Sequence, residues 1–182
     1  MAGTVRERRE EGSGRFLRYA LLLVLALGAA LFISRGRSGP KTGTQAEAFD
    51  LPVVAGNRER FRLADQKGTP VVVEVFASWC GVCRRTAPML SDAARAPRKN
   101  PVRFIGVSVD QDAIAAKSAK DQWNLAYDVA LDDGRFSKAY GITVLPTLIL
   151  IDGEGRVRHV SAGAPRSSEL EDWLEDVGAA RL

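Results

Sequence analysis

Two cysteines, Cys80 and Cys83, lie three positions apart in the stretch EVFASWCGVCRRTAPML and are the only cysteines of this 182-residue chain. We expect the pair where a strand passes into a helix, because the first helical turn brings the two Cα atoms within the range of a disulfide. Unpaired backbone N–H groups at a helix N-terminus favour a thiolate, so the pKa of the first cysteine should fall below its usual value of about 8.5. The spacing therefore predicts a reversible disulfide in which Cys80 is the nucleophile and Cys83 resolves a mixed disulfide.

Three other interpretations of the pair are a structural disulfide, two inert thiols and half of a zinc site. A disulfide that closes so short a loop adds little stability, because the entropy of loop closure grows with loop length. Tetrahedral zinc needs four ligands, or three and a water molecule, and besides the cysteines the chain has a single histidine, His159, in a distant predicted hairpin. The context favours a redox pair that holds no metal.

Glu74 lies in the middle of VVVEVFA, residues 71–77, a run that is apolar on both faces and typical of a central strand. A carboxylate is costly there unless its pKa rises or it finds a partner. The strand leads from Glu74 to the underside of the predicted disulfide, so a buried carboxyl group could take the proton of Cys83 as that thiol attacks. An edge position in water and a buried ion pair with an arginine are the other interpretations of Glu74.

Strands and helices alternate in the sequence around these residues. The strand that holds Glu74 is followed by a helix over 81–96, which Pro97 ends, and by an apolar strand over 102–110, so the three form a right-handed β-α-β unit. The other expected elements are a hairpin over 49–63 that turns at Gly56-Asn57, a helix from the cap Asp112 to about Trp123, a strand over 127–132, a helical turn over 136–140, a hairpin of strands over 147–152 and 157–163, and a last helix capped by Ser167 or Ser168. We predict an α/β fold in which a mixed central sheet is flanked by helices on both faces.

The N-terminal part of the chain predicts a membrane anchor. Residues 16–33 contain one charge, Arg18, and at about 1.5 Å per residue they span roughly 27 Å, enough for a bilayer core. The arginines before the span place the N-terminus in the cytoplasm. We expect a cytoplasmic segment over 1–15, a signal-anchor over 16–33, a flexible tether over 34–45 and an extracytoplasmic domain over 46–182. A cleaved signal peptide is the alternative, although no good cleavage site follows the apolar run.

The net charge of +4 does not indicate a nucleic-acid partner, because the excess lies at the N-terminus. Residues 1–41 carry eight of the 26 Lys and Arg and three of the 22 acids. The other 141 residues, with 18 bases and 19 acids, are close to neutral. The composition therefore argues against a basic face for nucleic acid on the domain.

The chain resembles the thioredoxin superfamily over about residues 46–177. The resemblance rests on WCGVC, on the acid Glu74, on Pro88 in the following helix and on GITVLPTLILID, in which Pro146 lies where that family carries a cis-proline facing the disulfide. The N-terminal hairpin extension, the insertion around 110–132 and the single N-terminal transmembrane helix are similar to the membrane-tethered TlpA/ResA-type thiol-disulfide oxidoreductases. A thioredoxin-like fold is therefore implied.

The resemblance also implies a role for each residue that matches the motifs. These roles are the redox pair for Cys80 and Cys83, the buried proton carrier for Glu74, substrate-backbone binding for Leu145 and Pro146, and an apolar contact surface for Trp79. Two positions depart from related patterns. Gly81-Val82 stands where cytosolic thioredoxins have Gly-Pro, so their redox potential cannot be transferred, and Thr86 stands where some tethered relatives have glutamate.

The function that the resemblance implies is reduction of disulfides in extracytoplasmic proteins, with cytochrome c maturation among the roles of its relatives. The enzyme would lie on the periplasmic side of the cytoplasmic membrane. The chain has no Gly-x-Gly-x-x-Gly fingerprint, so we expect no flavin or nicotinamide cofactor and expect a membrane protein to donate the electrons. The alternatives are a thiol peroxidase and a protein of the same fold that binds Cu(I) through both thiolates.

Overall fold

The computed structural model describes residues 18–25, 28 and 39–182. The chain divides into two units, Met1–Arg37 and Ser38–Leu182. In the first unit residues 18–25 are helical, and the rest of the predicted anchor, apart from residue 28, lies outside the described residues, as do the predicted segment over 1–15 and the start of the tether. None of the helices described is both long enough and apolar enough to cross a membrane.

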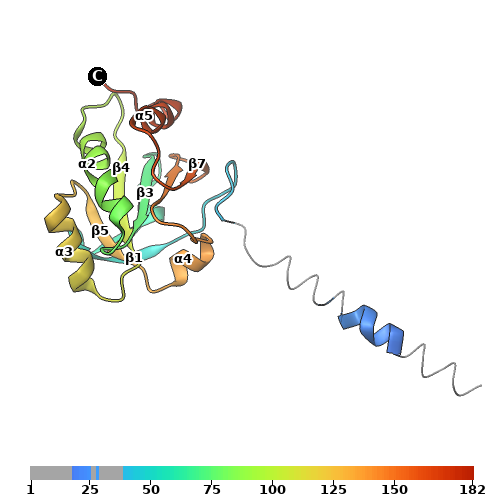
Figure 1. Cartoon of the computed structure of the whole chain (residues 1–182). Helices are drawn as coiled ribbons and strands as arrows, with labels where there is room; N and C mark the ends of the chain where they lie inside the picture. The colour runs from blue at the N-terminus through green and yellow to red at the C-terminus, as the bar shows by residue number, and fades with distance from the viewer. Residues whose placement is uncertain (1–17, 26–27, 29–38) are drawn as a thin grey trace, which may run out of the picture. The chain divides into compact units, whose positions relative to one another are not determined.

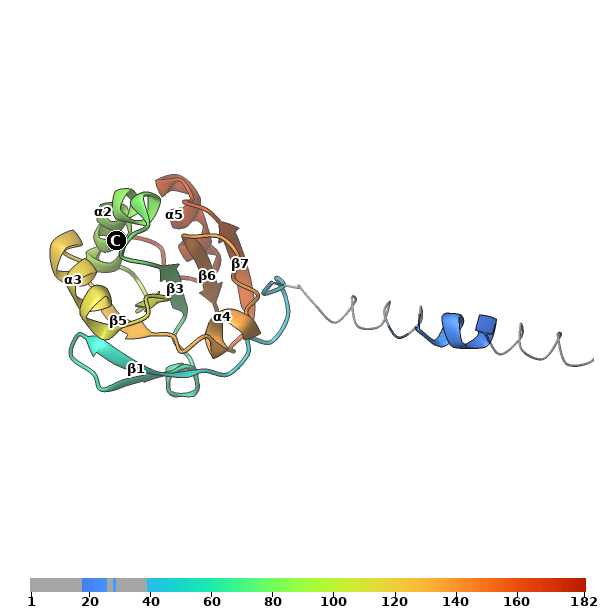
Figure 2. The ribbon, with the colours of Figure 1, turned by 60° about the horizontal axis from the view of Figure 1, so that its bottom comes forward.

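The second unit is built on a mixed sheet of seven strands in the order β2-β1-β5-β4-β3-β6-β7 (Figures 1 and 2). The strands are β1 (Asp50–Ala55), β2 (Arg60–Arg62), β3 (Val71–Phe76), β4 (Arg103–Ser108), β5 (Asp128–Leu131), β6 (Thr147–Ile151) and β7 (Val157–Ala162). The helices are η2 (Leu63–Gln66), α2 (Gly81–Arg95), α3 (Ala113–Trp123), α4 (Arg135–Ala139) and α5 (Ser167–Asp176). The predicted order of elements is confirmed, with bounds that differ by a few residues.

The centre of the sheet is the predicted β-α-β unit of β3, α2 and β4. β3 pairs in parallel with β4, from Val71 opposite Arg103 to Phe76 opposite Ser108, and pairs antiparallel with β6 on its other side. All six residues of β3 are buried, because the strand has a neighbour on each edge and side chains packed on each face. The continuous apolar run of the sequence thus marks the middle of the sheet.

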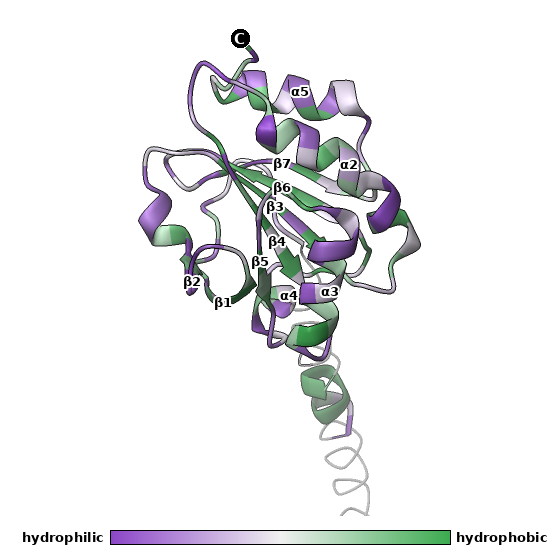
Figure 3. Ribbon diagram, turned by 90° about the vertical axis from the view of Figure 1, so that its left-hand side faces the viewer, coloured by the Kyte–Doolittle hydropathy of each residue, from purple (hydrophilic) through white to green (hydrophobic). Residues whose placement is uncertain are grey.

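Alternation along β3 sends its side chains into two separate cores. Val72 and Phe76 pack in a cluster with residues of α2, α3 and α5, whereas Val71, Val73 and Val75 pack in a second cluster with Phe136 and Tyr140 around α4. Figures 2 and 3 show α2 and α5 side by side on one face of the sheet. Glu74 shares the parity of Val72 and Phe76, so its side chain points toward the α2 face.

The predicted caps of the helices are partly wrong. Asp112 caps α3 as expected, since its side chain accepts a hydrogen bond from the backbone N–H of Ala115 at 2.8 Å. Neither Ser167 nor Ser168 caps α5, because the helix begins at Ser167 and Arg166 takes the cap position. The Glu169 carboxylate accepts from the backbone N–H of Arg166 at 3.4 Å, so an acid in the first turn satisfies the N–H of the cap residue.

Candidate redox site

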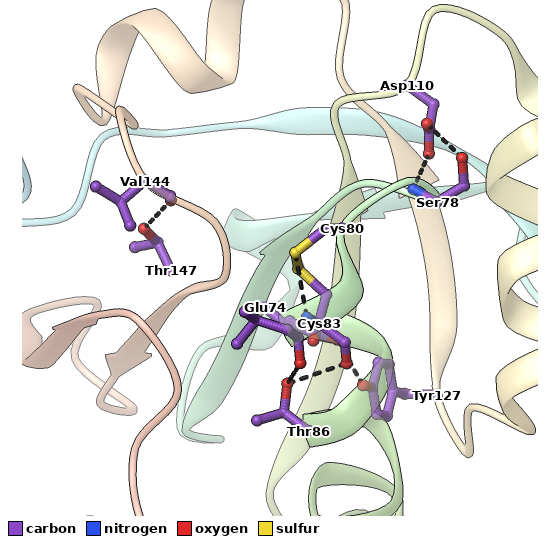
Figure 4. Close-up of a disulfide and its surroundings, with 10 residues drawn as sticks. Glu74, Ser78, Cys80, Cys83, Thr86, Asp110, Tyr127, Val144 and Thr147 are labelled. Carbon is purple, nitrogen blue, oxygen red and sulfur yellow. Dashed lines mark hydrogen bonds between the residues drawn. A yellow bond between two sulfur atoms is a disulfide. The ribbon is translucent and has the colours of Figure 1, made fainter.

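Cys80 and Cys83 are joined by a disulfide at the start of α2, with their Cα atoms 5.3 Å apart (Figure 4). Cys80 is the N-cap residue in extended conformation, and Cys83 is in the first turn. The Sγ of Cys80 accepts a hydrogen bond from the backbone N–H of Cys83 at 3.1 Å. This backbone donor and the positive end of the helix dipole are placed to stabilise a thiolate on Cys80 once the disulfide opens.

The two sulfurs differ in how a partner can reach them. Cys83 is completely buried, whereas Cys80 keeps 7% of its surface exposed and follows Trp79, which is 73% exposed. A partner cysteine can therefore approach Cys80 but not Cys83. This asymmetry fits the order of attack predicted from the sequence, in which Cys80 meets the partner and Cys83 acts from inside.

Glu74 is buried, as the pattern of its strand predicts, with 2% of its surface exposed. Its Oε2 accepts a hydrogen bond from the hydroxyl group of Tyr127 at 2.6 Å, and its Oε1 has no hydrogen-bond partner among the described residues. No arginine pairs with it in this part of the chain, which removes the buried ion pair from the interpretations of Glu74. Figure 4 shows Glu74 and Tyr127 close to Cys83 on the inner side of the disulfide.

Burial decides the protonation of this carboxyl group. Loss of hydration raises the pKa of Glu74 to about 7, although the hydrogen bond from Tyr127 partly opposes this. The pKa of Tyr127 lies well above its ordinary value, because burial and the neighbouring Glu74 both disfavour the phenolate, so Tyr127 remains a hydrogen-bond donor. Near neutral pH Glu74 can therefore gain or lose a proton beside the disulfide.

The loop between β3 and α2 is held by Asp110 at the end of β4. Asp110 accepts hydrogen bonds from the backbone N–H of Ser78 at 2.9 Å, from the Ser78 hydroxyl at 2.8 Å and from the Ser108 hydroxyl at 2.7 Å. Because β3 and β4 run in parallel, their carboxyl ends meet at one edge of the sheet, and Asp110 fixes there the turn that presents Trp79 and Cys80.

The predicted cis peptide bond joins Leu145 and Pro146, in the loop that precedes β6. Thr147 at the start of β6 lies opposite Val75 at the end of β3, so this loop reaches the same edge of the sheet as the disulfide. The Thr147 hydroxyl donates to the Val144 carbonyl at 2.7 Å, and Val144 is 46% exposed (Figure 4). The structure thus brings the loop of Leu145 and Pro146 to the disulfide edge, as a surface for a substrate backbone requires.

His159 lies away from this edge. It is on β7, its ring stacks on Trp173 with centroids 5.1 Å apart, and its Nε2 lies 3.1 Å from Oδ2 of Asp176. His159 lies in a hairpin strand, as predicted, and α5 packs against its ring through Trp173. Among the described residues no group of three or more His, Cys, Asp and Glu side chains could hold a metal ion.

Two residues of the site, Tyr127 and Asp110, were not singled out from the sequence. Tyr127 follows α3, 53 positions after Glu74, and only the fold brings them together. Asp110 carried a weak signal, because a polar residue that ends an apolar strand next to the site strand belongs at the same sheet edge. Nothing in the local pattern around Tyr127 distinguishes its hydroxyl group from that of an ordinary core tyrosine.

Residues 41–174 of the chain match the Redoxin family. The relatives include the thiol-disulfide oxidoreductase ResA of Bacillus subtilis, which is 29% identical over 164 residues that cover 87% of this chain and 90% of the relative. ResA of Bacillus thuringiensis is 29% identical over 163 residues, which cover 88% of this chain and 94% of the relative. The match spans nearly the whole of both relatives.

Solved structures show the same fold. A putative thiol:disulfide interchange protein DsbE from Chlorobium tepidum has a TM-score of 0.66 at 26% identity, with 76% of this chain and 99% of that chain covered. A secreted Mycobacterium tuberculosis disulfide oxidoreductase, described as homologous to E. coli DsbE, has a TM-score of 0.61 at 26% identity and covers 70% of this chain and 95% of its own. The α/β arrangement of mixed sheet and flanking helices is thus thioredoxin-like.

The raised pKa of Glu74 predicts how the free energy of unfolding changes with pH. Between pH 4.5 and about 7 the folded chain holds a proton that the unfolded chain has lost, so the free energy of unfolding falls as pH rises through this window. Glu74→Gln removes the ionisable group and with it this fall in the free energy of unfolding. Relative to wild type, we expect the oxidised variant to gain about 3 kcal/mol between pH 4 and pH 8, measured by denaturant unfolding. A difference that stays constant with pH would contradict the raised pKa.

Tyr127→Phe tests the hydrogen bond to Glu74. Because the bond stabilises the carboxylate, its loss should raise the pKa of Glu74 by about one unit, measured by NMR titration of the ¹³C-labelled carboxyl group. Tyr140→Phe is the matched control: the Tyr140 hydroxyl donates at 2.6 Å to the carbonyl of Glu47, and its ring packs in the other core. Equal shifts in the two variants would show that the contact with Glu74 is not the cause.

Proposed function

Because the chain belongs to the Redoxin family and is a thiol-disulfide oxidoreductase, we propose that it reduces disulfides in protein substrates. The observation that carries the proposal is the position of the pair, with an approachable Cys80 on the outside and a buried Cys83 above a carboxyl group that titrates near pH 7. This arrangement supplies a nucleophile near the surface, and a resolving thiol and a proton acceptor in the interior behind it.

In the proposed reaction the reduced enzyme supplies two electrons. The Cys80 thiolate attacks one sulfur of the partner's disulfide and forms a mixed disulfide, and the other partner sulfur leaves as a thiolate that takes a proton. Cys83 then passes its proton to the Glu74 carboxylate and attacks the Sγ of Cys80, which releases the second partner sulfur. The enzyme ends as the Cys80–Cys83 disulfide, and the partner as a dithiol.

Return to the reduced state reverses the internal proton transfer. A donor thiolate attacks the Sγ of Cys80, and the Cys83 sulfur that leaves takes the proton from Glu74. The second thiol of the donor then attacks the mixed disulfide and releases Cys80 as a thiolate, so that the donor ends as a disulfide and the enzyme as a dithiol. We propose a membrane protein as the electron donor and cytochrome c maturation as one setting for the activity. Both rest on the resemblance to tethered relatives.

We propose further that the domain is tethered to the cytoplasmic membrane on its extracytoplasmic side. The support is the apolar run over 16–33, with one charge and with arginines before it.

A trapping experiment tests the activity. Reduced wild type should reduce insulin or a model peptide disulfide, Cys80→Ser should lose all activity, and Cys83→Ser should accumulate the mixed disulfide through Cys80, seen by mass spectrometry after acid quenching. Resolution in the wild type should slow as pH falls below about 7, when Glu74 is protonated. Tight Cu(I) binding without turnover would instead favour the copper-binding alternative.

Labelling in intact cells tests the location. After mild reduction, a membrane-impermeant maleimide should label Cys80 in whole cells, and the protein should stay in the membrane fraction through a carbonate wash. A variant with Arg6, Arg8 and Arg9 changed to Glu weakens the orientation signal and serves as the comparison. Labelling only after cell lysis, or release into the soluble fraction, would contradict the proposed location.

A further inference from the structure

Two arginines beside the disulfide have no carboxylate partner among the described residues, although most arginines of the domain are paired. Of the thirteen arginines over 39–182, nine lie within 4.0 Å of a carboxylate oxygen. The nine are Arg58, Arg60, Arg62, Arg95, Arg98, Arg135, Arg156, Arg158 and Arg181. Arg84 and Arg85 are exposed and form no ion pair with any residue that the structure describes.

Both arginines lie directly after Cys83 on α2. The backbone N–H of Arg84 donates to the carbonyl of Cys80 at 3.1 Å, in the first turn of the helix. The Arg85 guanidinium reaches back over the segment between the cysteines, since a Cβ placed on Gly81 would lie 3.7 Å from its Nη1. The permanent positive charge of Arg85 therefore lies at the rim of the disulfide, and Arg84, four residues after Cys80, adds a second from the same turn of the helix.

Carboxylates at the same sheet edge are already engaged elsewhere. The first turn of α2 has no acid, and the buried Asp110 accepts hydrogen bonds from Ser78 and Ser108. Asp112 caps α3, and Asp133 pairs with Arg135 at 2.6 Å. The carboxylates named here already have partners, so the guanidinium groups of Arg84 and Arg85 are available to bind a carboxylate of another molecule.

The apolar part of the rim indicates what that molecule contacts. Trp79 in the cysteine loop is 73% exposed, Val82 in the first turn of α2 is 39% exposed, and Val144 in the loop before β6 is 46% exposed. A partner segment that lies on these side chains, with its cysteine at Cys80, would place its neighbouring side chains within reach of Arg84 and Arg85.

We propose that the enzyme prefers protein disulfides whose reacting cysteine is flanked by Asp or Glu. The proposal rests on the proposed disulfide exchange and adds a substrate class to it. Arg84 and Arg85 would draw the acidic segment to the site and hold it by charge-assisted hydrogen bonds, which favours the encounter more than the chemical step. The bonds made and broken at sulfur stay those of the exchange already given.

A series of peptides tests this preference. Three peptides share one Cys-x-x-Cys disulfide and differ only in two flanking residues, which are Glu, Gln or Lys. The rate constant for their reduction by the pre-reduced full-length chain is measured by acid quenching and mass spectrometry. We expect the Glu peptide to react about tenfold faster than the Lys peptide at 20 mM ionic strength and about twofold faster at 500 mM, because salt screens exposed charges.

Arg84→Gln with Arg85→Gln should reduce the ratio of Glu to Lys peptide rates at low salt to about two or less. The control pair is Lys67→Gln with Arg103→Gln. Both residues are exposed and lack ion pairs within the described residues, and they lie where β3 and β4 begin, whereas the disulfide follows the other end of β3. This control should keep the wild-type ratio. Circular dichroism confirms that both double variants are folded.

Each other outcome contradicts the proposal in a distinct way. Equal rates for the three peptides would overturn the charge preference and leave disulfide reduction standing. A loss of rate in Arg84→Gln/Arg85→Gln by the same factor for all three peptides would show that the arginines act on the Cys80 thiolate and not on the partner. Failure to reduce any peptide would overturn the proposed function itself, and this inference with it.

Discussion

Glu74 occupies a strand position at which the neighbouring side chains on both faces are aliphatic or aromatic, and an ionised carboxylate is costly there. The domain accepts the group because it can stay protonated up to about pH 7 and because Tyr127 supplies one hydrogen bond. A buried arginine partner would hold the carboxylate permanently charged and so remove its capacity to exchange a proton. The absence of such a partner within the described domain leaves a group that changes charge in the pH range where activated thiols do.

The site depends on three parallel strands that end together. β3, β4 and β5 run in the same direction, so the cysteine loop, Asp110 and the residues after β5 gather at one edge. Asp110 and Asp132 use their oxygens on backbone N–H groups, the first in the cysteine loop and the second at the start of α4. Short local hydrogen bonds of this kind hold the loops that surround the disulfide without filling the space a partner needs.

The parts of this structure that follow from local rules could be predicted from the sequence. Three features could each be recognised from local sequence: the buried valine-rich strand, the Cys-x-x-Cys after it, and Asp112 as the cap of the following helix. The structure has all three where they were expected. The cap of α5 could not be read in this way, since a serine, an arginine and a glutamate all compete near its start. Tyr127 was missed for a stronger reason: its partner lies 53 positions away and is reached only when β5 docks beside β4.

The contact between Tyr127 and Glu74 gives the segment between α3 and β5 a chemical role. If the segment served only to widen the sheet, its side chains toward the core would be apolar, as Val129 and Leu125 are. Tyr127 instead carries a hydroxyl group into the same core and directs it at Glu74, where a phenylalanine would fill the same volume. A hydroxyl in that position has one physical effect that packing cannot give, which is to stabilise the carboxylate and lower its pKa toward neutrality. Tyr127, which lies between α3 and β5, therefore lowers the proton affinity that burial gives to the acid behind the disulfide.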